Sequence, residues 1–241
     1  MLDRRQPLGH SLLNGLVAYW PLDDSREPSA NSGWRDLHSG MKLSQGSGGP
    51  PSNAQGVYGA QASLFETVNS EYLLRASEAA LQVADIDFTF SAWVYPVSLP
   101  AAAARVVSKR ANGTTSHEYD LYVETGGKVG FFLRTAAGTQ FGLEGASTTV
   151  TTSAWHLIWG WHDASADTVN VQVNSGAVDS ITSSGNVPTT NTSEFQIGSL
   201  QQVARPWDGR IMGVSFWKRV LTAEERTYLY NGGIGRKYPF V

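Results

Sequence analysis

The sequence predicts an all-β protein built as a sandwich or a barrel. From Gly15 onward, short runs rich in Val, Tyr, Trp, Phe and Thr are separated by Gly, Ser, Asn and Pro clusters about every 8 to 12 residues. Hydrophobic residues at 41%, with 11% aromatics, are enough to fill a large core. The sequence has no internal repeat, and its amino-acid composition does not change along the chain. We therefore expect the 241 residues to form a single domain.

Residues 1–14 show no periodicity and contain no apolar cluster large enough to fold alone. We interpret them as an N-terminal arm of a domain that spans residues 15–241. Arg4 and Arg5 in this arm are candidates for docking on an acidic partner, although adjacent arginines are also typical of a solvated segment. The start lacks the apolar stretch of about 7 to 15 residues found in a signal peptide, so we expect synthesis in the cytoplasm.

Strands are expected where β-branched and aromatic residues gather between turn signals. The predicted strands cover residues 15–20, 57–65, 71–75, 87–96, 105–109, 118–124, 128–134, 139–143, 155–162, 168–173, 177–182, 194–198 and 209–218. Residues 44–56, SQGSGGPPSNAQG, are predicted to form an exposed loop because they are rich in Gly, Pro and Ser. Gly126-Gly127, between two of these runs, predicts a tight hairpin.

One helix is predicted, in the segment LTAEERTYLYNGG near the C-terminus. Thr222 as N-cap and Glu225 three residues later form the pattern of a capping box. Gly232 and Gly233 supply a left-handed stop. The chain is therefore expected to add one short helix after its last strand.

The stretch WHLIWGWHD, residues 155–163, raises the question of a metal site or a catalytic histidine pair. In a strand, its three tryptophans and Leu157 share one face, and His156 and His162 share the other. Six residues place the two histidines about 20 Å apart, which is too far to hold one metal ion. The stretch therefore predicts a strand whose large side chains fill a core.

Several segments in order are similar to the laminin-G-like members of the concanavalin A-like lectin/glucanase superfamily. The segments are GLVAYWPLDD, DFTFSAWVYP, EYDLYVETGGKVGFFL, WHLIWGWHD, FQIGSL and WDGRIMGVSFWKRVLTAEERTYLYNGG, within about residues 15–235. The resemblance implies a jelly-roll sandwich of two curved antiparallel sheets. It also implies roles in carbohydrate binding, adhesion, protein interaction or glycoside cleavage, and a frequent place among phage structural proteins. Met212 and Gly213 depart from the pattern, because many relatives have acidic residues there.

The nearest approach to a glycosidase motif is EYDLYVE. Glu118, Asp120 and Glu124 share one strand face, but the outer two are about 20 Å apart. Retaining glycosidases need two carboxyl groups about 5 to 5.5 Å apart. Glu118 and Asp120 are closer but lack a second matched Glu, so the stretch favours a polar outer face. No serine-hydrolase, zinc-protease or phosphate-loop motif appears, and the chain is expected not to be an enzyme.

Four aspartates resemble those lining calcium sites in the family: Asp23, Asp24, Asp36 and Asp208. Calcium takes six to eight oxygen ligands, many from the backbone, and leaves weak traces in a sequence. The alternative is that these side chains stabilise turns. Calcium is thus the one cofactor that the sequence suggests.

Four aromatic residues are candidates for contact with a glycan or a partner: Trp93, Tyr95, Tyr122 and Trp207. Alternation turns the first three away from the expected core, and sugar recognition places an aromatic ring on the pyranose face. The alternative is that they pack beneath loops or another subunit.

Composition narrows the class of partner. A net charge of -3 gives no basic field for nucleic acid, no apolar run is long enough to enter a membrane, and the absence of cysteine excludes thiolate chemistry. We expect a non-catalytic binding or assembly module. The favoured form is a phage-type virion surface protein of decoration or fibre type, located at a virion or extracellular surface. The alternatives are a free carbohydrate-binding lectin and, after that, a glycosidase or polysaccharide lyase. Glycans or protein subunits of a surface assembly are the expected partners, and a homo-oligomer is compatible with either.

Overall fold

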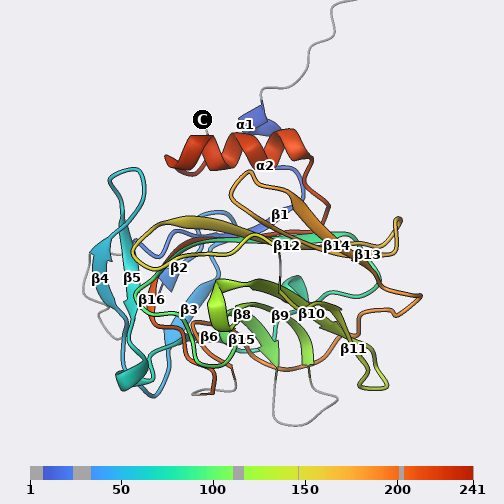
Figure 1. The fold of residues 1–241 in the computed structure, drawn as a ribbon, viewed down its shortest axis with the longest axis horizontal. Helices are drawn as coiled ribbons and strands as arrows, with labels where there is room; N and C mark the ends of the chain where they lie inside the picture. Colours follow the sequence, from blue (N-terminus) through green and yellow to red (C-terminus); the bar gives the residue numbers. More distant parts are fainter. Residues whose placement is uncertain (1–7, 24–33, 111–116, 146, 201–203, 241) are drawn as a thin grey trace, which may run out of the picture.

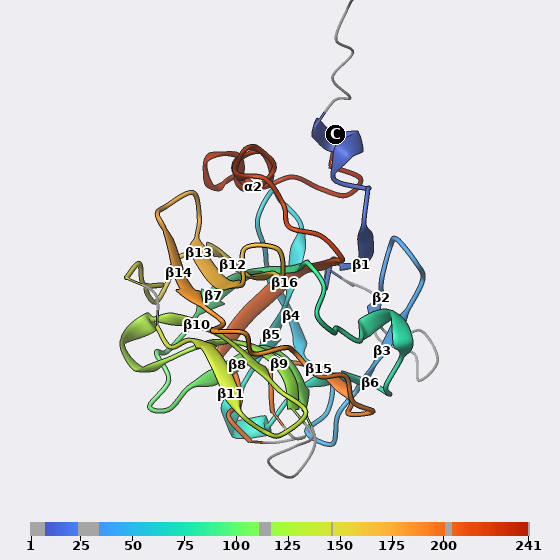
Figure 2. The ribbon, with the colours of Figure 1, turned by 90° about the vertical axis from the view of Figure 1, so that its right-hand side faces the viewer.

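The computed structural model describes residues 8–23, 34–110, 117–145, 147–200 and 204–240. Within these residues two eight-stranded sheets stack face to face (Figures 1 and 2), and all pairings between named strands are antiparallel. This confirms the predicted all-β jelly-roll sandwich. Each predicted strand overlaps an observed one.

The first sheet has the order β14-β13-β12-β7-β16-β5-β4, and β1 pairs with β16. Its strands are β1 Leu16–Trp20, β4 Ser52–Gln55, β5 Gln61–Phe65, β7 Phe88–Pro96, β12 His156–Asp163, β13 Thr168–Val173, β14 Val178–Thr182 and β16 Gly209–Trp217. The central strands β7 and β16 are almost entirely buried, as expected for strands covered on both faces.

The second sheet has the order β11-β10-β9-β8-β15-β6-β3-β2. Its strands are β2 Trp34–Arg35, β3 Lys42–Gln45, β6 Leu73–Arg75, β8 Ala104–Arg110, β9 His117–Val123, β10 Val129–Arg134, β11 Gln140–Leu143 and β15 Phe195–Ile197. The register of β8 against β9 shifts between Arg105 and Val107 and again between Lys109 and Arg110. Such bulges re-aim the side chains beside them.

The predicted loop at residues 44–56 is wrong in part, because the end of β3 and all of β4 lie within it. β4 reads Ser-Asn-Ala-Gln and is exposed at the edge of the first sheet, where it pairs only with β5. An exposed edge strand needs no apolar alternation, so its sequence resembles a loop.

The helices are α1 Leu8–Ser11 and α2 Ala223–Tyr230, with 3₁₀ turns at Thr67–Asn69, Ala79–Leu81, Thr125–Gly127 and Asn231–Gly233. The capping box of Thr222 and Glu225 is confirmed. The left-handed stop begins one residue earlier than predicted, at Asn231 with φ 48°, and Gly232 continues it. No helix in the described segments is long and apolar enough to cross a membrane.

The main core lies between the two sheets and is rich in aromatic rings. Phe90 and Phe216 of the first sheet stack with ring centroids 4.4 Å apart, and Tyr119 of the second sheet lies 4.7 Å from Phe90. These contacts fix the sheets relative to each other, because buried aromatic pairs add to the free energy of burial.

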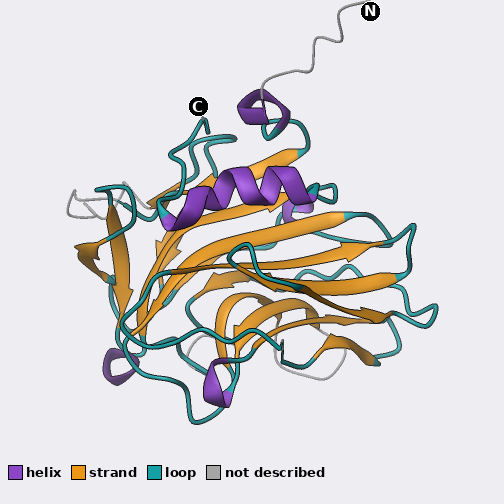
Figure 3. Ribbon diagram, turned by 45° about the horizontal axis from the view of Figure 1, so that its top comes forward, coloured by secondary structure: helices purple, strands orange, loops and turns teal. Residues whose placement is uncertain are grey.

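The tryptophans of WHLIWGWHD lie in an apolar cluster that is separate from the main core between the sheets. Leu157, Trp159 and Trp161 belong to a second apolar cluster with Trp93 and Leu229, beneath α2 on the outer side of the first sheet (Figures 1 and 3). Ile158, on the other face of the strand, enters the main core. The period-2 alternation was right, but it cannot tell which face lies inward when both faces are covered.

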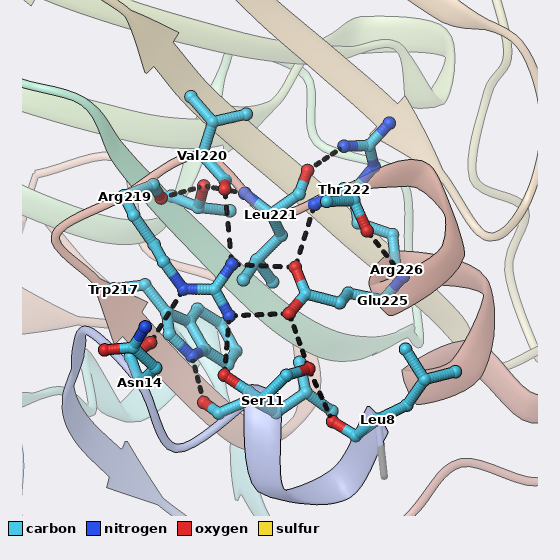
Figure 4. A network of polar contacts seen from close by, with 12 residues as sticks. Leu8, Ser11, Asn14, Trp217, Arg219, Val220, Leu221, Thr222, Glu225 and Arg226 are labelled. Atoms are coloured by element: carbon cyan, nitrogen blue, oxygen red, sulfur yellow. Dashed lines mark hydrogen bonds and ion pairs between the residues drawn. The ribbon is translucent and has the colours of Figure 1, made fainter. Parts of the chain in front are cut away.

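Residues 8–14 do not form an arm, which corrects the predicted boundary at residue 14. α1 packs beside α2, and Leu12 is fully buried in the second cluster (Figure 4). Trp217 Nε1 donates to the carbonyl of Leu12 at 2.8 Å, and Arg219 donates to the carbonyl of Ser11 at 3.0 Å. One buried leucine and two polar anchors are enough to fold a segment that could not fold alone.

Candidate ligand-binding face on the second sheet

The outer faces of the two sheets differ in what covers them. α2, α1 and the C-terminal segment that includes Phe240 lie on the outer side of the first sheet (Figures 1 and 3). The outer face of the second sheet points the other way and carries polar and charged side chains, which on β8, β9 and β10 are almost all buried. Alternation places Tyr119 and Leu121 of β9 in the main core and turns Asp120 and Tyr122 to this outer face.

Asp120 is the centre of a polar cluster that draws on three neighbouring strands. Arg105 Nε on β8 donates to Asp120 Oδ2 at 3.2 Å, and His117 Nε2 lies 3.2 Å from the same oxygen. Arg134 Nε on β10 donates to His117 Nδ1 at 3.2 Å. The strand register therefore brings together side chains that are far apart in sequence. We call Arg105, Arg110, His117, Asp120 and Arg134 the arginine cluster.

The contact with Arg134 fixes the tautomer of His117. Because Arg134 Nε donates to Nδ1, Nδ1 accepts and the ring proton is on Nε2. That nitrogen lies 3.2 Å from Asp120 Oδ2, but the geometry between them is not that of a hydrogen bond. His117 thus links the arginine on β10 to the carboxylate on β9.

The carboxylate of Asp120 is held in its charged form. Burial alone would raise its pKa, but His117, Arg105 and Arg110 together lower the pKa below its ordinary value. Asp120 Oδ1 is buried and has no hydrogen-bond partner among the described residues. One oxygen of the carboxylate is therefore committed to the cluster and the other is unpaired.

Arg110, at the end of β8, is the least satisfied member of the cluster. Its Nε is buried without a partner in the described part of the chain. Burial lowers the pKa of Arg110, Asp120 raises it, and repulsion from Arg134, Arg105 and Arg205 lowers it further, with a net lowering. Arg110 therefore lies in the electrostatic field of Asp120 and of three other guanidinium groups.

An aromatic pair lies beside these charges. Tyr122 stacks on Phe132 with ring centroids 5.1 Å apart, and the Arg105 guanidinium lies 4.6 Å from the Tyr122 centroid. Tyr122 lies flat across Gly130, where any Cβ would come within 2.3 Å of the tyrosine ring. Glycine at position 130 therefore allows the ring to lie along the sheet.

Glu118, the other acid of the predicted motif, is engaged elsewhere. It is fully buried with Lys109, whose Nζ lies 2.6 Å from Glu118 Oε2, and it accepts from the backbone N–H of Val83. Burial raises the pKa of Glu118 and lowers that of Lys109 in spite of their contact. Glu118 and Asp120 have separate partners and do not form a paired acid and base.

The four predicted contact aromatics do not come together. Trp93 is 4% exposed and stacks on Tyr230 beneath α2, and Trp207 is 1% exposed in the main core. Tyr95 lies beside Trp155, with the Arg210 guanidinium 4.4 Å from its ring. Tyr122 is also buried, but it is the one of the four that belongs to the outer face of the second sheet. The burial of Trp93 and Trp207 supports the alternative that these side chains pack inside the protein and do not contact a ligand.

The predicted metal ligands are dispersed as well. Asp36 is 1% exposed and accepts from the backbone N–H groups of Tyr19, His38 and Ser39 at 2.6–2.8 Å, as the turn alternative predicts. Asp208 accepts from the Ser98 hydroxyl. Asp23 follows β1, and Asp24 lies outside the described residues. Across the described ranges, no three His, Asp or Glu side chains gather as metal ligands.

Arg4 and Arg5 also lie outside the described residues. The residues that the sequence did not single out are Arg105, Arg110, His117 and Arg134. Their signal was the outward face of the strand around Asp120, but the arginines come from neighbouring strands. Only the pairing register could have placed them beside Asp120.

A family model described as Laminin_G_3, concanavalin A-like lectin/glucanases superfamily, matches residues 69–225. The chain belongs to this superfamily. The match covers β6 to the first turn of α2, including every strand that contributes to the arginine cluster. It confirms the resemblance drawn from the sequence motifs. No curated protein sequence matches the chain.

Solved structures with the same lectin-like fold include domains known for binding. The binding domain of Paraclostridial Mosquitocidal Protein 1 has a TM-score of 0.72 at 14% identity and covers 92% of this chain and 53% of its own. A second relative is Domain 4 of AbnA, a GH43 extracellular arabinanase from Geobacillus stearothermophilus, solved in complex with arabinotriose. Its TM-score is 0.66 at 17% sequence identity, and the match covers 88% of this chain and 96% of that domain.

The CBM40 of the Ruminococcus gnavus IT-sialidase, bound to α2,3 sialyllactose, has a TM-score of 0.52 at 16% identity and covers 59% of this chain and 80% of its own. The chain thus spans about half the length of the toxin domain, at 53%, and most of the two carbohydrate-associated domains. At these identities the likeness concerns the fold.

Proposed function

We propose that this chain is a non-catalytic, lectin-like module that binds glycans on the outer face of its second sheet. The observation that carries the proposal is the arginine cluster beside the aromatic pair Tyr122 and Phe132, with Arg110 partly exposed at the end of β8. Sugar hydroxyls are both donors and acceptors, and such polar groups around an apolar surface are typical of small-ligand sites. The two fold relatives solved with arabinotriose and sialyllactose support this class of ligand.

Binding is favoured over catalysis because the carboxylates are committed. Glycoside hydrolysis needs one carboxylic acid and one free carboxylate across the bond. Glu118 is paired with Lys109, and Asp120 is held charged by Arg105 and His117. We therefore expect no release of reducing ends from a polysaccharide panel.

A glycan array, with and without calcium, tests the proposal. Gln140→Trp would place a bulky ring on exposed β11 beside Arg134 and should reduce binding to any glycan that wild type retains. Gln61→Trp makes the same change at an exposed position on the first sheet and should leave binding unchanged. An array on which wild type binds nothing, or on which both variants behave alike, contradicts the proposal. The calcium arm also tests the predicted ion.

The narrower prediction of a phage-type virion surface protein remains a proposal. A particle protein is expected to have an N-terminal arm, but residues 8–14 of the predicted arm are part of the folded body. Purified chain that assembles into oligomers, or that co-sediments with a particle, would support it. A monomer that binds glycans on its own would favour the free lectin.

A further inference from the structure

A groove of about 550 Å³ lies across β3, β6 and β15 of the second sheet. These strands are neighbours on the other side of β8 from β9 and β10 (Figures 1 and 2). Volumes of about 300–1,000 Å³ are typical of sites for small ligands. We call this cavity the β6 groove. Six side chains that line it are all exposed or half-buried: Lys42, Ser44, Leu74, Arg75, Glu78 and Glu194.

Strand register places this groove on the outer face of the sheet. Leu43 of β3 and Leu73 of β6 enter the main core, so alternation turns Ser44 and Leu74 outward. Ser44 and Leu74 are paired across the two strands. Ser44 is exposed and Leu74 is half-buried, so a ligand in the groove meets a hydroxyl beside an apolar surface.

Hydrogen bonds within the protein hold the two walls of the groove. The Ser77 hydroxyl and Gln82 Nε2, on the wall after β6, donate to the carbonyl of Asn191 on the wall before β15, at 3.4 and 3.2 Å. The Nζ of buried Lys109 donates to the same carbonyl at 2.6 Å. The groove is therefore preformed, and a ligand that enters it does not have to order these loops.

Arg75 ties the end of β6 to β3. Its guanidinium group pairs with Glu78 and donates to the carbonyl of Lys42 at 2.9 Å. Glu194 accepts from Gln196 Nε2 at 3.3 Å. The positions of these charged groups are thus set by the protein before any ligand binds.

The charges in the groove balance. Lys42 and Arg75 are basic and Glu78 and Glu194 are acidic, so the lining has no net charge. An anionic ligand would lie near two carboxylates and a cationic ligand near an ammonium and a guanidinium group. A neutral polyhydroxyl ligand avoids both repulsions, because each hydroxyl can donate to a carboxylate and accept from an ammonium group.

We infer that the β6 groove is a second subsite of the proposed glycan face and binds a neutral sugar unit. The inference rests on the proposed function and names a ligand class and a place on the same face. In this subsite Glu194 accepts from a sugar hydroxyl, Lys42 donates to another, and Leu74 contacts the C–H surface of the sugar ring.

Isothermal titration calorimetry with arabinotriose, cellotriose and α2,3-sialyllactose tests the ligand class. We expect at least one of the two neutral trisaccharides to bind more tightly than the acidic sugar. Ser44→Trp fills the groove from an exposed strand position and should lower the affinity for that trisaccharide at least about tenfold by steric exclusion. Ser52→Trp makes the same change on exposed β4 of the first sheet and should leave the affinity unchanged.

A second variant tests the polar contact without adding bulk. Glu194→Gln should lower the affinity for the neutral trisaccharide about tenfold, since a hydrogen bond to a charged group is worth about that factor. Glu224→Gln removes the same charge at an exposed position of α2 and should have no effect. Thermal unfolding confirms that each variant is folded.

Three outcomes would overturn the inference: neither neutral trisaccharide binds, the acidic sugar binds most tightly, or Ser44→Trp and Ser52→Trp bind alike. In each case the proposed function stands as long as the glycan array is positive and Gln140→Trp lowers that binding. A glycan array on which wild type binds nothing would overturn the proposed function itself.

Discussion

Asp36 shows how one side chain can fix a turn. Its carboxylate accepts from three backbone N–H groups and from the Ser39 hydroxyl, and it ties the start of the loop to Tyr19 on β1. Hydrogen bonds to a buried charge stabilise more than neutral ones, and each donor left unpaired costs about 1–3 kcal/mol. Asp36 is therefore expected to act through stability.

Asp36→Ala should lower the free energy of unfolding by at least about 2 kcal/mol, because it leaves several buried donors unpaired. Urea denaturation measures the change. Asp36→Asn keeps one acceptor and should lose less. An alanine variant within about 0.5 kcal/mol of wild type would show that water replaces the carboxylate.

Gly160 is a second position where one residue decides packing. A Cβ there would lie 2.7 Å from Phe131 Cγ and 3.1 Å from Leu121 Cδ1, in the core between the sheets. Gly160→Ala should destabilise by about 1–3 kcal/mol through overpacking. Unfolding in urea measures the loss.

Phe131→Leu tests whether the loss of stability in Gly160→Ala comes from a clash with the Phe131 ring. If the methyl group clashes with the ring, the double variant Gly160→Ala/Phe131→Leu should be more stable than the sum of the single losses predicts. Strictly additive losses would mean that the alanine acts through something other than Phe131.

At the scale of elements, Glu225 joins α1, α2 and the end of β16 (Figure 4). Its carboxylate receives two hydrogen bonds from Arg219, at 2.7 and 2.8 Å, and one from the Ser11 hydroxyl at 2.8 Å, besides its capping-box bond to Thr222 N at 2.9 Å. Burial raises the pKa of Glu225, but these donors outweigh it and the pKa is lowered. The capping box thus also docks α1.

The lowered pKa of Glu225 predicts how stability depends on pH. A carboxyl group whose folded pKa is depressed stabilises the fold above its unfolded pKa of about 4.3, and this contribution is lost as pH falls through the folded pKa. The stability difference between wild type and Glu225→Gln should therefore be constant near neutral pH and shrink below about pH 4.3. Urea unfolding from pH 7 to pH 3 measures it.

Glu224→Gln is the matched control, since Glu224 is exposed in the same helical turn. The difference in unfolding free energy between Glu224→Gln and wild type should stay small from pH 7 to pH 3. If the stability of Glu225→Gln depends on pH in the same way as that of Glu224→Gln, the contacts of Glu225 with Ser11 and Arg219 contribute nothing to stability.

At the scale of the whole molecule, α1, α2 and the C-terminal segment cover one side of the sandwich. The second apolar cluster joins α1, α2 and the C-terminal segment to the first sheet, and both ends of the described chain lie there (Figure 3). The proposed glycan face lies on the opposite sheet. A neighbouring module attached at either end would leave that face accessible.

Truncation tests whether residues 8–14 belong to the fold. A chain that begins at residue 15 should be less stable than one that begins at residue 8 by at least about 2 kcal/mol, from the burial of Leu12 and the lost bond to Trp217 Nε1. For a chain of this size the Tm should fall by about 4–8 °C. Equal Tm values for the two chains would mean that residues 8–14 do not stabilise the fold, as predicted for an arm.

The pattern of the sequence determined most of the strands, the capping box and the side of each predicted strand on which a residue lies. These are local properties, since period-2 alternation and turn residues depend only on neighbours in the chain. The same reasoning separated Asp120 from the core residues Tyr119 and Leu121.

Tertiary structure alone decided what each face meets. It buried Trp93, which the sequence predicted as a contact residue, and Trp159 in the cluster beneath α2, and it buried Leu12 from a segment without periodicity. It also set the register that brings Arg105 and Arg134 to Asp120. Contacts across strands depend on pairing and on bulges, and the sequence encodes these only through the free energy of the whole fold.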